Sequence, residues 1–466
     1  SFPRQSVAEL AEILSLSSLL CLGRHTVTAL LCTCGRQFRD WTAPYRLFSH
    51  ERFDPTAAFT VIRRDLLAQL PSDMPLCVAM DDSLLPKTGT KIPGVAWRRD
   101  PLGPKFQTNL LRAQRVLQLS AALPPRDAPG PTRTIPIDFA HVPTPAKPRK
   151  NASEEDKKAY RSASKAASMA LHGAQHVQAL RQALDLDPGQ AQRPLRMLVD
   201  GRFTNQTFLR HLPANTTVIG RIRKDAKLYH PPAAPTSAVT GRGRPPDYGR
   251  LAPTPEQLRT DESVPWLPVR AFAAGKEHDF KIKTLGNLRW RPAGPSQVFT
   301  VLVIAPLAYR LSQGSRLLYR EPAFLICNDP HLPPQQIVRS YPWRWEVEVN
   351  FREQKTVLGI GQAQVRHAAS VELEPALGVI SYAMLLLADS HRTPEDQSAL
   401  PPAKWNAHTV PQRTSTQQLV NILRGEVWGR GLGVENFSGF TSALPADMKP
   451  EKFPLDPAPA VLYCRN

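Results

Sequence analysis

Two short apolar runs that stop at acidic residues are the clearest feature of the hydrophobic pattern. Residues 76–80 are followed by Asp81, Asp82 and Ser83, and residues 195–199 are followed by Asp200. Apolar runs of about four to eight residues that end at polar or turn residues are typical of buried strands. The sequence therefore predicts two buried strands, each ending in a carboxylate.

Helical and strand-like patterns alternate around these two runs. Residues 1–70 repeat apolar positions with a helical period, and Ser153 with Asp156 marks the start of a long Ala-rich helix over residues 153–184. Alternating strands and helices indicate a mixed α/β sheet. Further strands are predicted at residues 115–123, 134–139 and 217–222.

The second half of the chain begins with a change of composition. Between Arg202 and Thr260 there are ten Lys or Arg residues and three acids, with many Pro and Gly, which predicts a basic loop that leads into a β-rich insertion. The pattern then predicts a strand at residues 324–327 and helices that begin at Pro333, at Pro375 and near Ser415. We expect a helical, DNA-binding N-terminal domain, a core in two parts separated by the insertion, and a Pro-rich C-terminal region, with the boundaries 1–70, 71–222, 223–320, 321–392 and 393–466.

Composition and charge narrow the class of protein. A chain of 466 residues with 42% hydrophobic and 21% charged residues is too long for a single small binding module and unlike a disordered chain or a coiled coil. The net charge of +19 and the pI of about 9.9 indicate a polyanionic partner, and nucleic acid is the first candidate.

Cysteine usage and hydropathy exclude further classes. The six Cys residues are too few and too irregularly spaced for a disulfide framework or a zinc site, and they fit a reducing cytoplasm. No run reaches the roughly 18 apolar residues that span a bilayer, so we expect no membrane association.

One polar segment stands out in the predicted helix after Pro333. At about 100° per residue, with Glu348 as zero, the cations and the tyrosine fall within about 40° on either side of it. They are Tyr341, Arg344, Arg352 and Lys355. Val347, Phe351 and Leu358 form an apolar stripe beside them. This pattern indicates either a carboxylate surrounded by phosphate-binding cations or a solvated face whose ion pairs are worth only tenths of a kcal/mol.

The spacing of this segment resembles a known motif. Tyr341, Arg344, Glu348 and Lys355 meet the Y-R-E-K spacing of bacterial insertion-sequence transposases with a DDE catalytic triad. Upstream, residues 78–83 resemble the first Asp motif of that family. Residues 198–202 resemble the second Asp motif, and residues 84–89 resemble the branch in which Pro-Lys and Gly follow the first Asp. The resemblance covers residues 75–390 and is loose at both ends.

The resemblance implies an RNase H-like core in which Asp81, Asp200 and Glu348 form the catalytic triad and hold two Mg²⁺ ions, with Mn²⁺ as a substitute. The chemistry fits this inventory, because phosphodiester cleavage with two divalent ions needs hard oxygen ligands close together. Tyr341, Arg344, Arg352 and Lys355 are then expected to contact DNA phosphates, as guanidinium and ammonium groups do.

Each acid also has a simpler explanation. Only one of Asp81 and Asp82 can point into the site, because strand side chains alternate between faces. We choose Asp81, since the family motif places its hydroxyl residue two positions after the ligand, here Ser83; Asp82 would then be an exposed acid at a strand end. Asp200 could instead cap a following helix.

Two secondary features complete the picture. Arg242 and Arg244 lie in a Gly-Arg-Gly-Arg-Pro sequence that resembles an AT-hook, and we expect both to contact phosphate; a basic flexible linker is the alternative to sequence-specific binding. Trp266 and Trp290 lie where related enzymes stack a flipped base, although core packing is the simpler role.

These observations predict a cut-and-paste transposase of a bacterial insertion sequence. The expected activity is metal-dependent hydrolysis at the element ends, followed by attack of the freed 3′-OH on target DNA, with no covalent protein intermediate. We expect double-stranded DNA as the partner, a homodimer in the synaptic complex, and a nucleoid-associated location. The alternatives are a catalytically silent, transposase-derived DNA-binding protein acting as a repressor or targeting subunit, and a general nuclease of the same fold.

Overall fold

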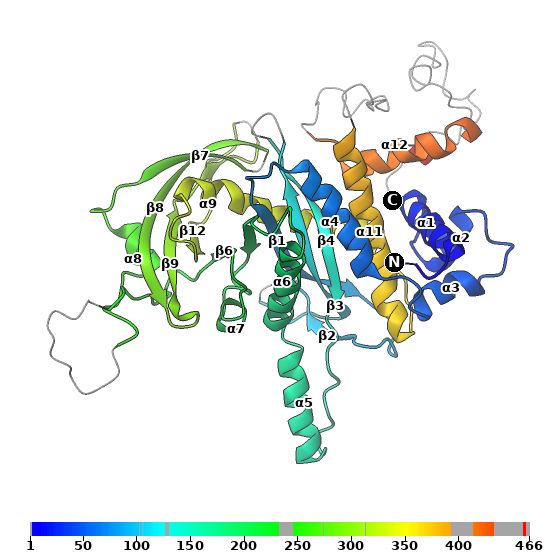
Figure 1. Ribbon diagram of the computed structural model, residues 1–466, viewed down its shortest axis with the longest axis horizontal. Coiled ribbons are helices and arrows are strands. Elements are labelled where there is room, and N and C mark those ends of the chain that lie inside the picture. The colour runs from blue at the N-terminus through cyan, green and yellow to red at the C-terminus, as the bar shows by residue number, and fades with distance from the viewer. Residues whose placement is uncertain are drawn as a thin grey trace, which may run out of the picture.

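A ten-stranded mixed sheet, with helices packed on both faces, forms the centre of the protein in the computed structural model (Figure 1). The order of its strands is β2-β3-β1-β5-β6-β12-β9-β8-β7, and β4 also pairs with β3. The structure describes residues 2–101, 103–104, 106–125, 130–232, 246–273, 275–312, 314–392, 413–432 and 460–462.

The sheet strands are β1 (Leu76–Pro86), β2 (Ala96–Arg99), β3 (Leu110–Leu123), β4 (Arg133–His141), β5 (Leu195–Val199), β6 (Thr216–Arg221), β7 (Leu267–Ala273), β8 (Lys276–Trp290), β9 (Gly294–Ile304) and β12 (Ala323–Cys327). A separate two-stranded sheet consists of β10 (Ala308–Tyr309) and β11 (Leu318–Tyr319).

The α-helices are α1 (Gln5–Leu20), α2 (Val27–Thr33), α3 (Thr42–Ser49), α4 (Pro55–Gln69), α5 (Glu154–Ala166), α6 (Met169–Asp185), α7 (Gln206–Leu209), α8 (Pro255–Thr260), α9 (Pro334–Ser340), α10 (Trp345–Thr356), α11 (Ala368–His391) and α12 (Thr416–Trp428). Within the described residues, the 3₁₀ turns are η1 (Tyr341–Arg344) and η4 (Arg430–Leu432).

Five neighbouring strands give the sheet its RNase H-like part. Strand β3 is antiparallel to both β1 and β4, whereas β1, β5 and β6 are parallel. Helix α6 covers the face of β1 that carries Met80, and α10 covers the opposite face, which carries Ser83. The predicted fold class, an RNase H-like mixed sheet with helical parts, is confirmed.

The β-rich segment after residue 260 extends this same sheet. Strand β12 is antiparallel to β6 on one side and to β9 on the other, and β8 and β7 follow β9 outward. The domain boundaries at residues 70, 222, 320 and 392 stay predictions.

Strand β1 is longer than its apolar run predicted. It continues through the acids to Pro86, because β3 pairs with it along the whole way, from Val78 opposite Ala121 to Pro86 opposite Ala113. The expectation that the strand ends at Asp81 was therefore wrong. A paired neighbour supplies backbone hydrogen bonds that keep polar residues in a strand.

Three predicted helices also differ from the observed ones. The long helix over residues 153–184 is two helices, because Ala167 ends α5 and Ser168 is extended before α6. The polar segment begins with the 3₁₀ turn η1 instead of a continuous α-helix. Helix α11 begins at Ala368, so Pro375 lies inside it and does not open it.

Helix α11 is the central core helix of the right-hand part of Figure 1, where it lies beside α4 and β4 and contacts α1 and α3. It is the one helix among the described residues that is long and apolar enough to cross a membrane, and 72% of that apolar window is buried inside the protein. The sequence prediction concerned unbroken apolar runs, and Glu372, Glu374 and Asp389 interrupt the one in α11. The burial of α11 is that of a core helix.

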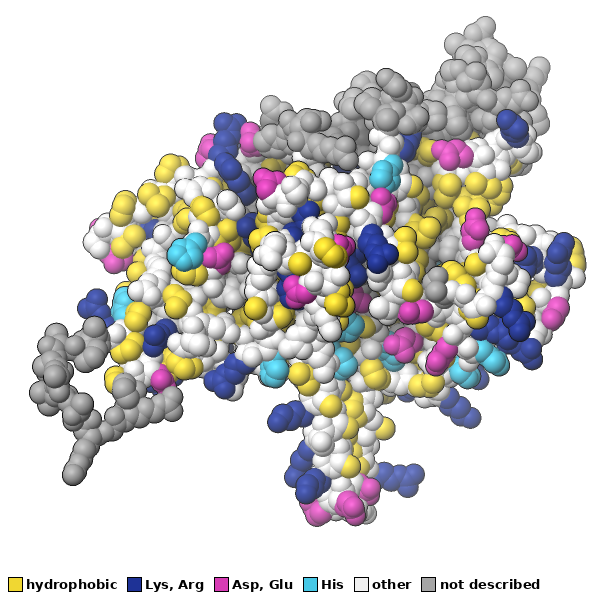
Figure 2. Space-filling view, viewed as in Figure 1, with side chains coloured by type: hydrophobic (Ala, Val, Ile, Leu, Met, Phe, Trp, Pro, Cys, Tyr) yellow, Lys and Arg dark blue, Asp and Glu magenta, His cyan; other side chains and the backbone are white. Residues whose placement is uncertain are grey.

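Basic side chains are spread widely over the face of the protein that Figure 2 shows. Lys and Arg side chains stand on the outer strands, on the N-terminal helices and around the projecting helix α5. The excess of 59 Lys and Arg over 40 Asp and Glu residues is thus not confined to one element.

Candidate active site

The predicted acids lie on three elements that meet beside two parallel strands. Asp81 lies within β1, Asp200 directly follows the neighbouring strand β5, and Glu348 lies on α10, which packs against β1. The guanidinium group of Arg344 lies 3.2 Å from Asp81 Oδ2 and 2.7 Å from Glu348 Oε1. Asp200 is close enough to Asp81 to act on it electrostatically. These four side chains therefore form one charged cluster.

Asp81 is the most perturbed member of the cluster. Its side chain is 16% exposed, and burial followed by the charge of Asp200 raises the pKa of its carboxyl group to about 7. The guanidinium group of Arg344 and the backbone N–H of Asp82, 2.8 Å from Asp81 Oδ1, act in the opposite direction. A further cation at this position would stabilise the ionised carboxylate.

Asp200 is held by the turn that follows β5. Its Oδ1 accepts a hydrogen bond of 2.8 Å from the backbone N–H of Arg202, and its side chain does not cap a helix. The cap of α7 is Asn205, whose side chain accepts from the N–H of Phe208. The helix-cap explanation for Asp200 is therefore wrong, because four residues separate it from the cap position.

Metal binding can be tested against the arrangement of these side chains. The predicted ligands are all carboxylates, which suits Mg²⁺. In the part of the chain that the structure describes, however, no three His, Cys, Asp or Glu side chains form a metal-binding group. Arg344 lies between Asp81 and Glu348 and supplies the positive charge there. The donor chemistry fits Mg²⁺, and metal binding requires that the guanidinium group leaves this position.

Asp82 points to the opposite face of β1 and has its own partners. Its side chain is only 7% exposed and makes ion pairs with Arg115, at 3.4 Å, and with Arg202. Arg98 lies near enough to interact electrostatically with Asp82, Arg115 and Arg202. The expectation that Asp82 is an exposed acid at a strand end was wrong, because β1 continues past it. Three guanidinium groups around one carboxylate leave a net positive patch beside the acids.

Arg115 and Arg202 are residues that the sequence patterns did not single out. Arg202 lies two residues after Asp200 in an Asp-Gly-Arg turn, and this turn is the signal that could have identified it. Its side chain is 54% exposed although it pairs with Asp82. Arg115 carries no such signal, because only the register of β1 and β3 brings it to the acids.

Tyr341 supports the site from behind. Its hydroxyl donates a hydrogen bond of 3.2 Å to the carbonyl of Val199, the residue before Asp200. Burial is the main reason that the pKa of this phenol rises to about 12. In this arrangement Tyr341 fixes the end of β5 and its hydroxyl is not presented to solvent as a phosphate ligand.

Lys355 and Arg352 lie further along α10. The Lys355 ammonium group donates to Ser83 Oγ at 2.7 Å, and burial lowers the pKa of this lysine. Arg352 is exposed. The structure thus brings Arg344 to Asp81 and Glu348, places Lys355 against Ser83 of β1, and leaves Arg352 at the surface.

A buried polar network seats α10 on the sheet. Asn350 Nδ2 lies within 3.2 Å of Ser120 Oγ, Thr134 O and Thr134 Oγ1, and its Oδ1 accepts from the hydroxyl of Tyr382 at 3.1 Å. Gln354 donates to Gln118 at 2.9 Å. The predicted apolar stripe is buried as expected, with Val347, Phe351 and Leu358 at most 7% exposed. These contacts fix the position of Glu348.

The secondary predictions have different outcomes. Arg242 and Arg244 lie outside the described residues. Trp266 and Trp290 both pack against the main hydrophobic core, with the Lys283 ammonium group 4.7 Å from the ring centroid of Trp266 and Phe299 edge-on to Trp290 at 6.4 Å. The core-packing explanation for both Trp residues is confirmed.

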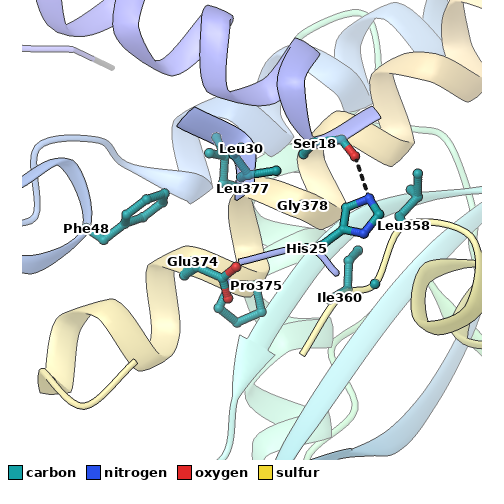
Figure 3. A pocket seen from close by; sticks show the side chains of 11 residues that line it. Ser18, His25, Leu30, Phe48, Leu358, Ile360, Glu374, Pro375, Leu377 and Gly378 are labelled. Carbon is teal, nitrogen blue, oxygen red and sulfur yellow. Dashed lines mark hydrogen bonds between the residues drawn. The ribbon is translucent and has the colours of Figure 1, made fainter. Parts of the chain in front are cut away.

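A small cavity lies away from the acids, between the N-terminal helices and α11. Figure 3 shows the side chains of His25 and Glu374 among apolar neighbours, with the His25 ring bonded to the carbonyl of Ser18 at 3.0 Å. Burial raises the pKa of Glu374 to about 7, partly offset by Lys87. The space is of the size of a water molecule, so it has no room for a substrate.

Comparison with known proteins assigns the chain to a family. No curated protein matches it. A family model described as DDE superfamily endonuclease matches residues 1–274, which is more than half of the 466 residues. The matched range includes Asp81 and Asp200, whereas Glu348 lies beyond it. With the RNase H-like sheet and the acids beside its parallel strands, this match shows that the chain belongs to the DDE superfamily endonucleases.

Proposed function

We propose that this endonuclease is the transposase of a bacterial insertion sequence. It cuts the ends of the element by metal-dependent hydrolysis and joins the freed 3′-OH to target DNA, as a homodimer that pairs two DNA ends. The observation that carries the proposal is the charged cluster of Asp81, Asp200, Arg344 and Glu348, assembled from β1, β5 and α10.

In this proposal the three carboxylates hold two Mg²⁺ ions. When bound, the ions supply the positive charge that phosphodiester cleavage needs beside the attacking and leaving oxygens. Asp81 suits this role, because burial and then the charge of Asp200 raise its pKa to about 7 even with Arg344 beside it, so that further positive charge would stabilise the carboxylate. Tyr341 holds the carbonyl of Val199 and thereby orients the turn that carries Asp200.

Arg344 changes partners in this proposal. In the absence of metal it neutralises Asp81 and Glu348. With the carboxylates holding metal, the guanidinium group of Arg344 would be free to bind a DNA phosphate next to the scissile bond, which suits its planar donor geometry. Lys355, which donates to Ser83, and the partly exposed Arg202, which pairs with Asp82 on the other face of β1, provide further phosphate contacts.

The test is cleavage of a labelled duplex made from the DNA that flanks the coding region. The wild-type protein nicks it with Mg²⁺ or Mn²⁺ and not with a chelator. Glu348→Gln lowers the rate at least about a hundredfold, because losing a ligand removes several kcal/mol of charge stabilisation in the transition state. Glu346→Gln is the matched control, since Glu346 lies on the same helix and pairs with Arg413 at 2.7 Å. Undiminished nicking by Glu348→Gln rules out the assignment.

A second pair of variants separates the adjacent acids of β1. Asp81→Asn abolishes nicking, whereas Asp82→Asn keeps metal-dependent nicking and weakens DNA binding, because Arg115 and Arg202 lose the carboxylate that orients them. The reverse pattern would make Asp82 the ligand.

A catalytically silent DNA-binding protein is the second candidate. The ion pairs of Arg344 with Asp81 and Glu348 favour this candidate, because ion pairs that persist would keep metal ions away from the two carboxylates. Binding of flanking DNA without any metal-dependent nicking would support this candidate over the transposase.

A further inference from the structure

A projecting arm is the part of the described structure that packs least on the rest. It consists of the extended segment of residues 143–152 and helix α5, and Figure 1 shows it pointing away from the sheet. None of the residues of α5 is buried. Most helices in proteins are stabilised by packing an apolar face. Because α5 packs no such face, its sequence is explained better by a partner than by the fold.

The arm is strongly basic. Residues 143–166 contain seven Lys or Arg residues and three acids. All three acids lie in the first turn of α5, where negative charge stabilises a helix start together with the Ser153 cap, which accepts from Asp156 N–H at 3.0 Å. The cations are Lys147, Arg149, Lys150, Lys157, Lys158, Arg161 and Lys165.

The cations of α5 share one face. At 100° per residue, Lys157, Lys158, Arg161 and Lys165 fall within an arc of about 100°. The opposite face carries small residues, Ala159, Ala163 and Ala166.

Three of these four cations are available to a partner. Lys157 makes an ion pair with Glu154 at 2.9 Å. The side chains of Lys158, Arg161 and Lys165 are exposed and make no ion pair or hydrogen bond to another described residue. Like charges three and four residues apart repel each other on a helix. A polyanion along this face would relieve that repulsion.

The arm leaves the sheet beside the site. Helix α6 follows α5 directly. Its His172 is within electrostatic reach of Arg115, and its Gly173 lies against the side chain of Met80. Arg115 is in turn 3.4 Å from Asp82. At the other end of the arm, Arg98 donates a hydrogen bond to Thr144. Both ends of the arm are thus attached around the arginine patch at Asp82.

We propose that the cationic face of α5 binds the phosphate backbone of duplex DNA outside the cleaved step. Helix α5 is about 20 Å long, which corresponds to about six base pairs of duplex. The arm therefore holds the DNA that continues beyond the acids, and it contributes affinity without sequence preference. This inference rests on the proposed function only in taking DNA as the substrate.

An anionic membrane is a poorer partner for this helix. Helices that lie in a membrane interface oppose their cations with large apolar side chains such as Trp, Phe and Leu. The face of α5 opposite its cations carries Ala159, Ala163 and Ala166 together with Asp156, and it offers little apolar surface for insertion.

The experiment measures the salt dependence of DNA binding by the full chain. The probe is a random-sequence duplex of about 30 base pairs, titrated between about 50 and 200 mM salt, where each neutralised phosphate contributes about 0.9 to the slope of log K against log salt. The triple variant Lys158→Gln, Arg161→Gln and Lys165→Gln should lower the slope by about 2 to 3. The matched control, Ala159→Gln with Ala163→Gln, changes the opposite face and should leave the slope unchanged.

Two results would overturn the proposal. The first is a slope that is equal in the triple variant and the wild type, or lowered equally by the control. The second is loss of binding to vesicles of phosphatidylserine and phosphatidylcholine in the triple variant while its DNA slope stays unchanged, which would make the arm a membrane-binding element. Circular dichroism checks that α5 stays helical, since Gln is a good helix former.

The outcome is independent of the cleavage test. If the wild-type protein nicks no duplex but the triple variant has a smaller salt slope of DNA binding, the arm is a DNA-binding element and the transposase proposal is refuted. A protein that nicks with Mg²⁺ and shows no change of slope would refute the role of the arm alone.

Discussion

Asn350 offers a quantitative test of how α10 is held in place. Its Nδ2 has three acceptors within 3.2 Å, from Ser120 and Thr134, and its Oδ1 accepts from Tyr382 at 3.1 Å. An amide nitrogen carries two protons, so two of the three acceptors are served at once, whereas the single hydroxyl proton of Tyr382 is shared between Asn350 Oδ1 and Glu353 Oε2. At about 1 kcal/mol for each full hydrogen bond, Asn350→Ala should lower the free energy of unfolding by about 2 to 3 kcal/mol.

The expected loss depends on what remains paired. The hydroxyl of Tyr382 keeps its bond of 2.6 Å to Glu353, and Ser120 keeps its bond of 3.0 Å from Gln118. The partners of Asn350 are therefore not all left without hydrogen bonds, and the loss should not greatly exceed 3 kcal/mol. Because Asn350 lies two residues after Glu348, the variant should also nick DNA more slowly at a temperature where it is still folded.

The assay is equilibrium unfolding in urea, followed by circular dichroism, with an unchanged m-value as the check that both states keep their compactness. Arg352→Ala, at an exposed position of the same helix, is the control and should change the stability by less than about 0.5 kcal/mol. A double-mutant cycle with Tyr382→Phe should give a coupling energy of at least about 0.5 kcal/mol. A loss below about 1 kcal/mol for Asn350→Ala, or no coupling to Tyr382, would refute the reasoning.

Two further predictions concern buried charges. Folding raises the pKa of Asp81 from 3.8 to about 7, so without divalent metal the stability of the protein falls as pH rises from about 4 to 7. Asp81→Asn should therefore raise the free energy of unfolding at pH 8 by at most about 4 kcal/mol. This gain in stability should shrink as pH falls toward 4. Urea titrations at several pH values measure it, and a gain that is independent of pH would contradict the cause given. Lys87 is 3% exposed and donates to the carbonyls of Gly361 and Ala363 at 2.9 and 2.7 Å. Lys87→Met should lower the free energy of unfolding by about 2 to 5 kcal/mol, because both carbonyls lose their partner, whereas Lys91→Met at the surface should leave the stability unchanged. Equal melting temperatures for the two variants would contradict this prediction.

Local patterns predicted the elements that depend on local physics. The apolar runs before Asp81 and Asp200 identified the two parallel strands, and the stripe of Val347 and Phe351 identified the buried face of α10. Ser153 marked a helix start, because a capping hydroxyl acts within one turn. The mixed α/β sheet followed from the order of such elements, whereas the RNase H-like core was implied by the resemblance to the transposase family.

Features that depend on pairing across the chain were not predictable in this way. The extension of β1 to Pro86 and the burial of Asp82 both follow from the register with β3. The turn of Tyr341 toward Val199 follows from a 3₁₀ segment that the periodicity of a regular helix does not describe. The contact of Arg344 with Asp81 joins residues 263 positions apart, and no local spacing specifies it.

The continuous sheet limits how the protein can adapt to DNA. Strand β12 is hydrogen-bonded to β6 on one side and to β9 on the other, so swinging β7, β8 and β9 away from the acids would break a row of backbone hydrogen bonds. The outer strands and the parallel strands beside the acids therefore form a rigid frame. If a duplex contacts both, any change of shape on binding has to come from the DNA, and easily deformed base steps would then be favoured even where no side chain contacts a base.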